Sequence, residues 1–270
     1  MLYRRVNDYD MAYIELGQGD PLVCIHGSLS DFRVWSPVLG PLSRHHRVIA
    51  PSLRRYFPEH WDGTGGGFTV AQHVADVIAF LEASGDKVNL LGHSRGGHVA
   101  FRVAQQRPDL LKTLVLAEPG GDLDESFAPK DVKSPSSIHA VIAAAAARIA
   151  AGDVESGLMS FIEGVDGPGV WQNLPAAARQ ELQDNAQTLI GQPYERRLPF
   201  TRSDVAAIAV PTLLIGGASS PASLLTILNT LARHIPNART KIIPNTGHMM
   251  FRQAPAQFSA LVTEFLRGKA

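Results

Sequence analysis

The 270-residue sequence contains one cysteine, so it can form no internal disulfide and no cysteine-rich metal site. This residue, Cys24, lies in an apolar run, where we expect a small buried side chain. No window holds the roughly 20 consecutive apolar residues that a membrane-spanning helix needs. The first residues contain no apolar core of signal-peptide length. We therefore expect a soluble, cytoplasmic protein with no membrane partner.

The sequence also lacks an excess of charge, because 25 Lys and Arg residues balance 25 Asp and Glu residues. A nucleic-acid-binding protein would carry a basic face, so we expect no nucleic-acid partner. The glycine-rich segment "GTGGG" (63–67) is not followed by the lysine of a P-loop. We expect neither a metal nor an organic cofactor. Oligomeric state is not readable from these features.

Short apolar runs alternate with segments of helical periodicity over most of the chain. Strands are predicted around Val6 and at 13–16, 21–27, 47–51, 87–92, 111–119, 210–217 and 240–244. Helices are predicted at 33–46, 69–85, 95–108, 223–236 and 255–268. Strands that alternate with helices form βαβ units, so the pattern predicts an α/β fold with a mostly parallel sheet flanked by helices.

Residues 120–205 interrupt the alternation and carry no strand signal. Helices are predicted there at 134–153, 153–164 and 174–191, the last with Pro175 near its first turn and Gly191 past its end. We therefore predict a core formed by residues 1–119 and 206–270, and a helical cap formed by residues 120–205.

A serine lies where a predicted strand meets a predicted helix, in the stretch Gly92-His93-Ser94-Arg95-Gly96. This G-x-S-x-G pattern typically holds a serine on a sharp turn, with its hydroxyl exposed at the edge of the sheet. The backbone N–H of Arg95 would point into the same space, where it could stabilise developing negative charge. The pattern makes Ser94 a candidate nucleophile and Arg95 a candidate oxyanion-hole residue.

A serine hydroxyl is a weak nucleophile unless a base activates it. Of the ten histidines, only His248 follows the last predicted strand, from where the edge carrying Ser94 is within reach. The segment "IHGSLSD" (25–31) follows the third strand and could supply a second oxyanion donor, at Ser28 or a neighbour. His26 is predicted to brace this loop, and His93 is predicted to pack within its turn.

The motifs "HGSLSD", "GHSRGG", "PTLLIGG" and "NTGHMM" resemble, in this order, those of the α/β-hydrolase superfamily. The resemblance covers nearly the whole chain. It implies an eight-stranded α/β-hydrolase sheet with an α-helical cap after the sixth strand. It also implies a Ser–His–acid enzyme that acts through an acyl intermediate.

The sequence departs from the family pattern at the catalytic acid. The family usually has an aspartate just after the seventh strand, where this chain has Ser220, and residues 205–255 contain no carboxylate. Glu118 is the first residue past the apolar run of the sixth predicted strand, and some relatives that resemble the haloalkane dehalogenases carry their acid after this strand. We predict Glu118 as the acid, with Asp122 and Asp124 as alternatives and the absence of a functional acid as a third possibility.

Substrate features are less specific. Arg33, Arg54, Arg55 and Arg95 lie near predicted strand ends and could bind an anionic group, with Arg33 as the candidate substrate-binding residue. Apolar residues of the cap could line a pocket for an acyl or alcohol group, namely Leu158, Met159, Phe161 and Trp171. We expect a serine hydrolase for a small or medium carboxylic ester. Thioesters, lactones, carbon–carbon bond hydrolysis, a cofactor-free dioxygenase and a non-catalytic ligand receptor remain alternatives.

Overall fold

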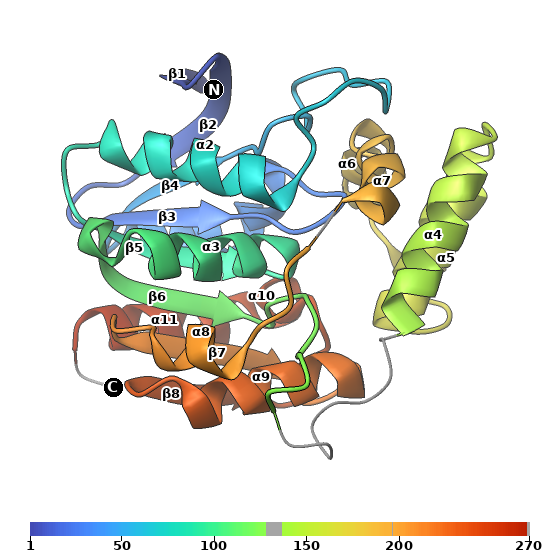
Figure 1. The fold of residues 1–270 in the computed structure, drawn as a ribbon. Coiled ribbons are helices and arrows are strands. Elements are labelled where there is room, and N and C mark those ends of the chain that lie inside the picture. Colours follow the sequence, from blue (N-terminus) through green and yellow to red (C-terminus); the bar gives the residue numbers. More distant parts are fainter. Residues whose placement is uncertain (128–136, 196, 269–270) are drawn as a thin grey trace.

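The computed structural model describes residues 1–127, 137–195 and 197–268. Its centre is an eight-stranded sheet with the order β1-β2-β4-β3-β5-β6-β7-β8 (Figure 1). Only β2 pairs antiparallel with its neighbours, β1 and β4, and the other pairs are parallel. The strands are β1 (Leu2–Val6), β2 (Tyr9–Leu16), β3 (Pro21–Ile25), β4 (Arg47–Pro51), β5 (Val88–His93), β6 (Leu111–Ala117), β7 (Thr212–Gly217) and β8 (Ala238–Ile243). The predicted α/β fold with a mostly parallel sheet is confirmed.

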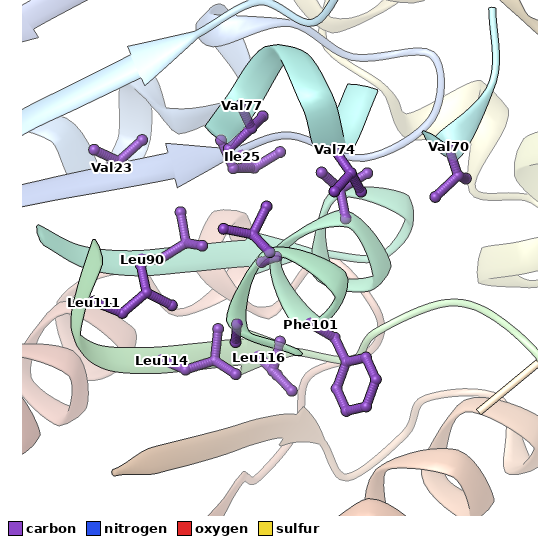
Figure 2. Close-up of a cluster of buried hydrophobic side chains, with 14 of the residues drawn as sticks. Val23, Ile25, Val70, Val74, Val77, Leu90, Phe101, Leu111, Leu114 and Leu116 are labelled. Carbon is purple, nitrogen blue, oxygen red and sulfur yellow. The ribbon is translucent and has the colours of Figure 1, made fainter. Parts of the chain in front are cut away.

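Helices cover both faces of the sheet, and alternate residues of each central strand point to opposite faces. On one face, α2 (Val70–Glu82) and α3 (Arg95–Gln106) share one apolar core with strand residues such as Val23 and Ile25 (Figure 2), and α9 (Ala222–His234) packs on β7 and β8. On the other face, α1 (Ser36–Ser43), α10 (Met250–Gln253) and α11 (Pro255–Leu266) pack on residues such as Leu22 and Cys24. Cys24 is fully buried, as predicted.

Local signals set the ends of several helices. The hydroxyl of Thr69 accepts a hydrogen bond from the N–H of Gln72 at the start of α2, so Thr69 is the N-cap of this helix. The helix predicted at 33–46 begins instead as a 3₁₀ turn, η1 (Phe32–Trp35), and α1 ends at Ser43. The short helices α8 (Arg202–Ala206) and α10 and the 3₁₀ turn η2 (Pro108–Leu110) were not predicted, because one turn carries too little periodicity.

A helical segment follows β6 and lies beyond the carboxyl ends of the parallel strands (Figure 1). It contains α4 (Ser137–Ala150), α5 (Val154–Asp166), η3 (Trp171–Asn173), α6 (Ala176–Asp184), α7 (Thr188–Gly191) and η4 (Gln192–Tyr194). Its buried apolar side chains form a separate core, which includes Leu29 from the loop after β3. The predicted start of the first helix, at 134–136, lies outside the described residues.

The prediction of one continuous helix over 174–191 was wrong. The segment breaks between α6 and α7, and Gly191 ends α7 instead of following it. The break follows from Asn185, whose amide donates to Asp31 and whose side-chain oxygen accepts from the N–H of Phe57. These tertiary hydrogen bonds join the helical segment to the core and outweigh local helix propensity. No helix within the described parts of the chain is both long and apolar enough to cross a membrane.

Candidate active site

Ser94 occupies the turn between β5 and α3 with a φ of 52° and a ψ of −120°, a conformation that is unfavourable for a residue with a side chain. Such a backbone costs about 1–3 kcal/mol and persists only where the surrounding structure enforces it. The glycines of the pattern allow the close packing that holds Ser94 in this conformation. A Cβ at Gly92 would collide with the backbone of Gly96, and a Cβ at Gly96 would collide with the backbone of Ile25 and His26.

We expect Gly96→Ala to lower the free energy of unfolding by about 3 kcal/mol, because the added methyl group meets the backbone of β3, which cannot move aside. Gly40→Ala is the matched control, since a Cβ at Gly40 in α1 meets no atom within 4 Å. This substitution is expected to raise stability by about 0.5–1 kcal/mol through helix propensity. Urea denaturation measures both values, and equal effects at the two positions would contradict the packing argument.

Glu118 and His248 form a buried pair beside this turn. The Nδ1 atom of His248 lies 2.6 Å from Oε2 of Glu118, and the two side chains are 5% and 0% exposed. The second oxygen of Glu118 accepts a 2.7 Å hydrogen bond from the N–H of Gly217. A Cβ at Gly217 would collide with the backbone of Thr246 and Gly247, so glycine at the end of β7 lets the loop that carries His248 approach.

The geometry distinguishes between the three candidate acids. Asp122 lies 2.7 Å from Nε2 of His139 in the helical segment. Asp124 accepts hydrogen bonds from the backbone and hydroxyl of Ser126. Glu118 alone of the three bonds to His248, as the sequence predicts. Ser220 follows β7 with its hydroxyl buried and without a hydrogen-bond partner among the described residues.

Two other histidines support the loops of the site. The Nε2 atom of His93 lies 3.0 Å from the carbonyl oxygen of His248, and the two rings lie 4.4 Å apart between centroids. Burial, together with the neighbouring His248, holds the pKa of His93 well below its ordinary value. A carbonyl only accepts, so Nε2 of His93 carries the proton and donates. The sequence predicts that His93 packs, but gives no sign that it fixes the backbone of His248.

His26 braces the loop after β3, as predicted. Its Nδ1 atom bonds to the carbonyl oxygen of Gly27 at 2.9 Å, and its Nε2 atom accepts from the N–H of Leu53 at 2.9 Å. Because Nε2 accepts a hydrogen bond, the ring is neutral with its proton on Nδ1, and burial lowers the pKa of His26 to about 4. The loop presents Ser28 to the same cavity as Ser94. The Ser28 hydroxyl donates to the side-chain oxygen of Gln192 in the helical segment.

Arg95 combines a backbone donor with a buried side chain. It is the first residue of α3, so its N–H belongs to the first turn, which has no intrahelical acceptor. Its guanidinium is paired with Glu195, with a distance of 2.7 Å between Nη2 and Oε2. Burial of Glu195 opposes its ionisation, but Arg95 and Arg197 hold the pKa of this carboxyl at about 2. The side chain of Arg95 thus anchors the helical segment.

One cavity of about 1010 Å³ contains Ser94, Arg95, Ser28 and His248 in its wall. Most of the apolar part of its remaining wall comes from α4, α5, α6 and the start of α9. Of the predicted lining residues, Phe161 does line the cavity. Contrary to the prediction, Leu158, Met159 and Trp171 do not: Leu158 and Trp171 are buried in the core of the helical segment, and Met159 is partly buried and packs against that core.

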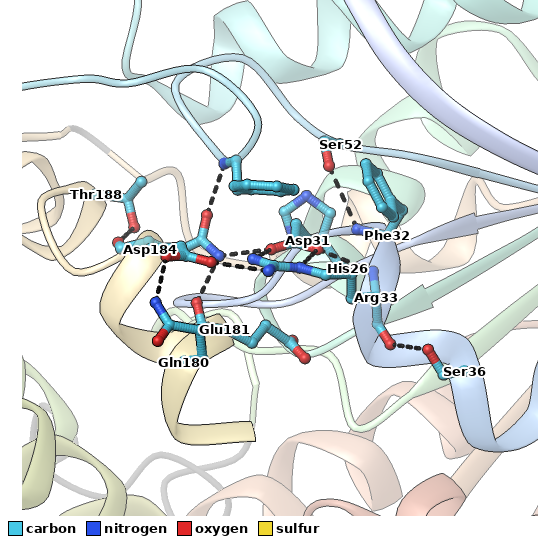
Figure 3. Close-up of polar contacts among 12 residues, drawn as sticks. His26, Asp31, Phe32, Arg33, Ser36, Ser52, Gln180, Glu181, Asp184 and Thr188 are labelled. Atoms are coloured by element: carbon cyan, nitrogen blue, oxygen red, sulfur yellow. Dashed lines mark hydrogen bonds and ion pairs between the residues drawn. The ribbon is translucent and has the colours of Figure 1, made fainter. Parts of the chain in front are cut away.

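The geometry gives no support to the predicted substrate role of Arg33. Arg33 does not line the cavity, and its guanidinium is held by Asp31 at 2.7 Å and by Asp184 at 2.8 Å (Figure 3). It also lies over the ring of Phe57, 3.8 Å from the centroid. Arg54 and Arg55 are likewise paired with carboxylates, those of Asp76, Asp8 and Glu59. These arginines join loops and helices, which a sequence pattern does not reveal.

No group of three or more His, Cys, Asp or Glu side chains within residues 1–127, 137–195 and 197–268 is arranged to hold a metal ion. The protein groups of the site include a serine with a strained backbone and an imidazole paired with a carboxylate, and both residues line one cavity.

Comparison with known proteins identifies the class. The alpha/beta hydrolase fold family matches residues 20–255, and the chain belongs to this family. A soluble epoxide hydrolase from Corynebacterium is 35% identical over 114 residues, 42% of this chain and 39% of that protein. The carboxylesterase CesB from Bacillus subtilis aligns over 99% of this chain and 91% of its own, with a TM-score of 0.80 and 17% identity.

A thermophilic esterase from Thermogutta terrifontis, solved with malate bound, covers 96% of this chain and 94% of its own, with a TM-score of 0.75 and 23% identity. At such identities the solved structures establish the likeness of the fold. Together with the family match, they support a hydrolase. The bond that is cleaved depends on the residues of the site.

Proposed function

We propose that this α/β hydrolase is a serine hydrolase that cleaves a small or medium carboxylic ester through an acyl-enzyme intermediate. The observation that carries the proposal is the buried Glu118–His248 pair, which shares one cavity with the strained Ser94 turn. A serine needs a base, and the base needs a group that fixes its tautomer. The chain provides residues suited to all three roles.

The role of Glu118 follows from the hydrogen bond at Nδ1. A carboxylate accepts hydrogen bonds, so Nδ1 of His248 carries the proton and Nε2 is left as the basic nitrogen. Nε2 takes the proton of Ser94 as its oxygen attacks the ester carbonyl. The imidazolium that forms is stabilised by Glu118, which remains ionised.

The tetrahedral intermediate carries its negative charge on the former carbonyl oxygen. We propose that the backbone N–H of Arg95 and the N–H of Ser28 or a neighbour donate to this oxygen. His248 then gives its proton to the leaving alcohol, and the acyl group remains on Ser94. Water, deprotonated by His248, attacks the acyl carbonyl and releases the carboxylic acid, which restores the Ser94 hydroxyl.

Residues 120–205 are proposed to act as a cap that selects the substrate. They provide most of the apolar wall of the cavity, including Phe161 and Ile162 of α5. A cavity of about 1010 Å³ can enclose a ligand of moderate size but not a polymer. An apolar wall favours an ester with an alkyl or aryl part.

We expect Glu118→Gln to lower kcat for a p-nitrophenyl ester by about 10²–10⁴-fold, because the amide neither selects the productive tautomer nor stabilises the imidazolium. KM should change little, since Glu118 is fully buried behind His248 and is not part of the cavity wall. Glu125→Gln is the matched control, an exposed carboxylate on the same connection after β6. Steady-state kinetics over p-nitrophenyl esters of graded chain length measures both constants.

An unchanged kcat in Glu118→Gln would contradict the proposed role of Glu118 as the catalytic acid. Ser220→Asp offers a second test, because it returns a carboxylate to the position that follows β7. In the Glu118→Gln background it is expected to recover part of the lost kcat. Ser220→Ala should be close to silent.

A further inference from the structure

The charged side chains around the cavity are almost all paired. Among the residues that the structure describes, ion pairs and hydrogen bonds at 2.6–2.7 Å account for each of them except one. The pairs are Arg95 and Arg197 with Glu195, Arg252 with Glu181, Asp122 with His139, and His248 with Glu118. The exception is Asp166.

Asp166 is the last residue of α5 and lines the cavity with His248. Within the described residues its carboxylate has no hydrogen-bond donor and no ion-pair partner. Ile162 lies one helical turn before it and lines the same wall, so Asp166 belongs to the face of α5 that the cavity exposes. Of the charged groups that influence this carboxylate, His248 and Arg252 lie in the same wall and Glu118 lies behind it.

This position disfavours a negative charge in two ways. The carboxyl end of a helix carries a partial negative charge, so an acidic side chain there is repelled. Burial raises the pKa of Asp166 above its ordinary value, and the charge of Glu118 adds to this rise, while His248 and Arg252 oppose it. An unpaired carboxylate at this place lowers the stability of the resting protein, and a bound cation would remove that cost.

We propose that Asp166 binds a positively charged amine on the ester substrate, and so selects esters that carry an ammonium group. This inference rests on the proposed ester hydrolysis. Charge complementarity favours a cation over a neutral group, because the three arginines of the wall are each paired with Glu195 or Glu181. A substrate carboxylate would meet repulsion from Asp166. The apolar wall would hold the carbon chain between the ammonium group and the ester.

Matched probes of one chain length test the site without turnover. Isothermal titration calorimetry at pH 7.5 compares hexylammonium with 1-hexanol on the full chain, on Asp166→Asn and on Glu155→Gln. Glu155 is exposed in the first turn of the same helix and does not line the cavity, so it is the matched carboxylate-to-amide control.

Hexylammonium is expected to bind the unmodified chain about tenfold or more tightly than 1-hexanol. Asp166→Asn should abolish this preference, and Glu155→Gln should keep it. Equal binding of the two probes to the unmodified chain would overturn the proposal and indicate a neutral subsite. A preference that survives in Asp166→Asn would overturn it as well. Because calorimetry needs no catalysis, loss of the amine site and absence of ester hydrolysis are separate outcomes.

Discussion

Replacing Ser94 with alanine is expected to reduce kcat for ester hydrolysis by about 10⁴–10⁶-fold, the span found when the nucleophile of a serine triad is removed. The remaining rate would come from substrate binding and from the backbone donors at Arg95 and near Ser28. The variant should fold normally, since Ser94 is part of the cavity wall and not of the apolar core. Initial rates with a p-nitrophenyl ester measure the loss.

Ser156→Ala is the matched control for this experiment. Ser156 lies on α5 away from the cavity, so the same loss of a hydroxyl should leave turnover unchanged. Circular dichroism on both variants separates loss of chemistry from loss of structure. If Ser94→Ala keeps its turnover and its spectrum, another residue is the nucleophile.

Replacing His248 with alanine should have an effect of similar size, because an unactivated serine is a poor nucleophile at neutral pH. The expected fall in kcat is again about 10⁴–10⁶-fold. His60→Ala provides the control, as His60 lies in an exposed loop. Stopped-flow detection of p-nitrophenol release measures acylation directly.

The double variant Ser94→Ala with His248→Ala sharpens this test. When residues act together in one step, the effects of removing them are not additive, so the double variant should lose no more activity than either single variant. Multiplied losses would mean that the two residues contribute independently. Rapid acylation in His248→Ala alone would identify a different base.

The sequence was sufficient for the parts of the structure that local patterns determine. Short apolar runs predict the strands, and a periodicity of 3.6 residues predicts the main helices. The glycines around Ser94 predict a tight turn because only glycine fits the contacts between the backbones of β3, β5 and α3. The absence of a carboxylate after β7 left Glu118 as the best acid, and the hydrogen bond to His248 agrees with that choice.

The parts that the sequence did not predict depend on contacts between distant segments. Arg33 resembles a free cation in the sequence, but Asp184, which follows 151 residues later, helps to neutralise it. Asn185 ends α6 through hydrogen bonds to Asp31 and Phe57. Helix propensity describes only local preference and cannot predict such distant contacts. No sequence motif marks Asp166 as a binding residue. Its position in the cavity wall, without a partner among the described residues, depends on the folded structure.

The central claim is that Ser94 is a nucleophile activated by His248. Incubating the folded chain with a fluorophosphonate probe, followed by intact-mass measurement and peptide mapping, tests it most directly. The expected result is one phosphonyl adduct per chain, located on Ser94, with labelling abolished in Ser94→Ala and slowed by orders of magnitude in His248→Ala. An adduct on another residue, or no adduct on a correctly folded chain, would contradict the account.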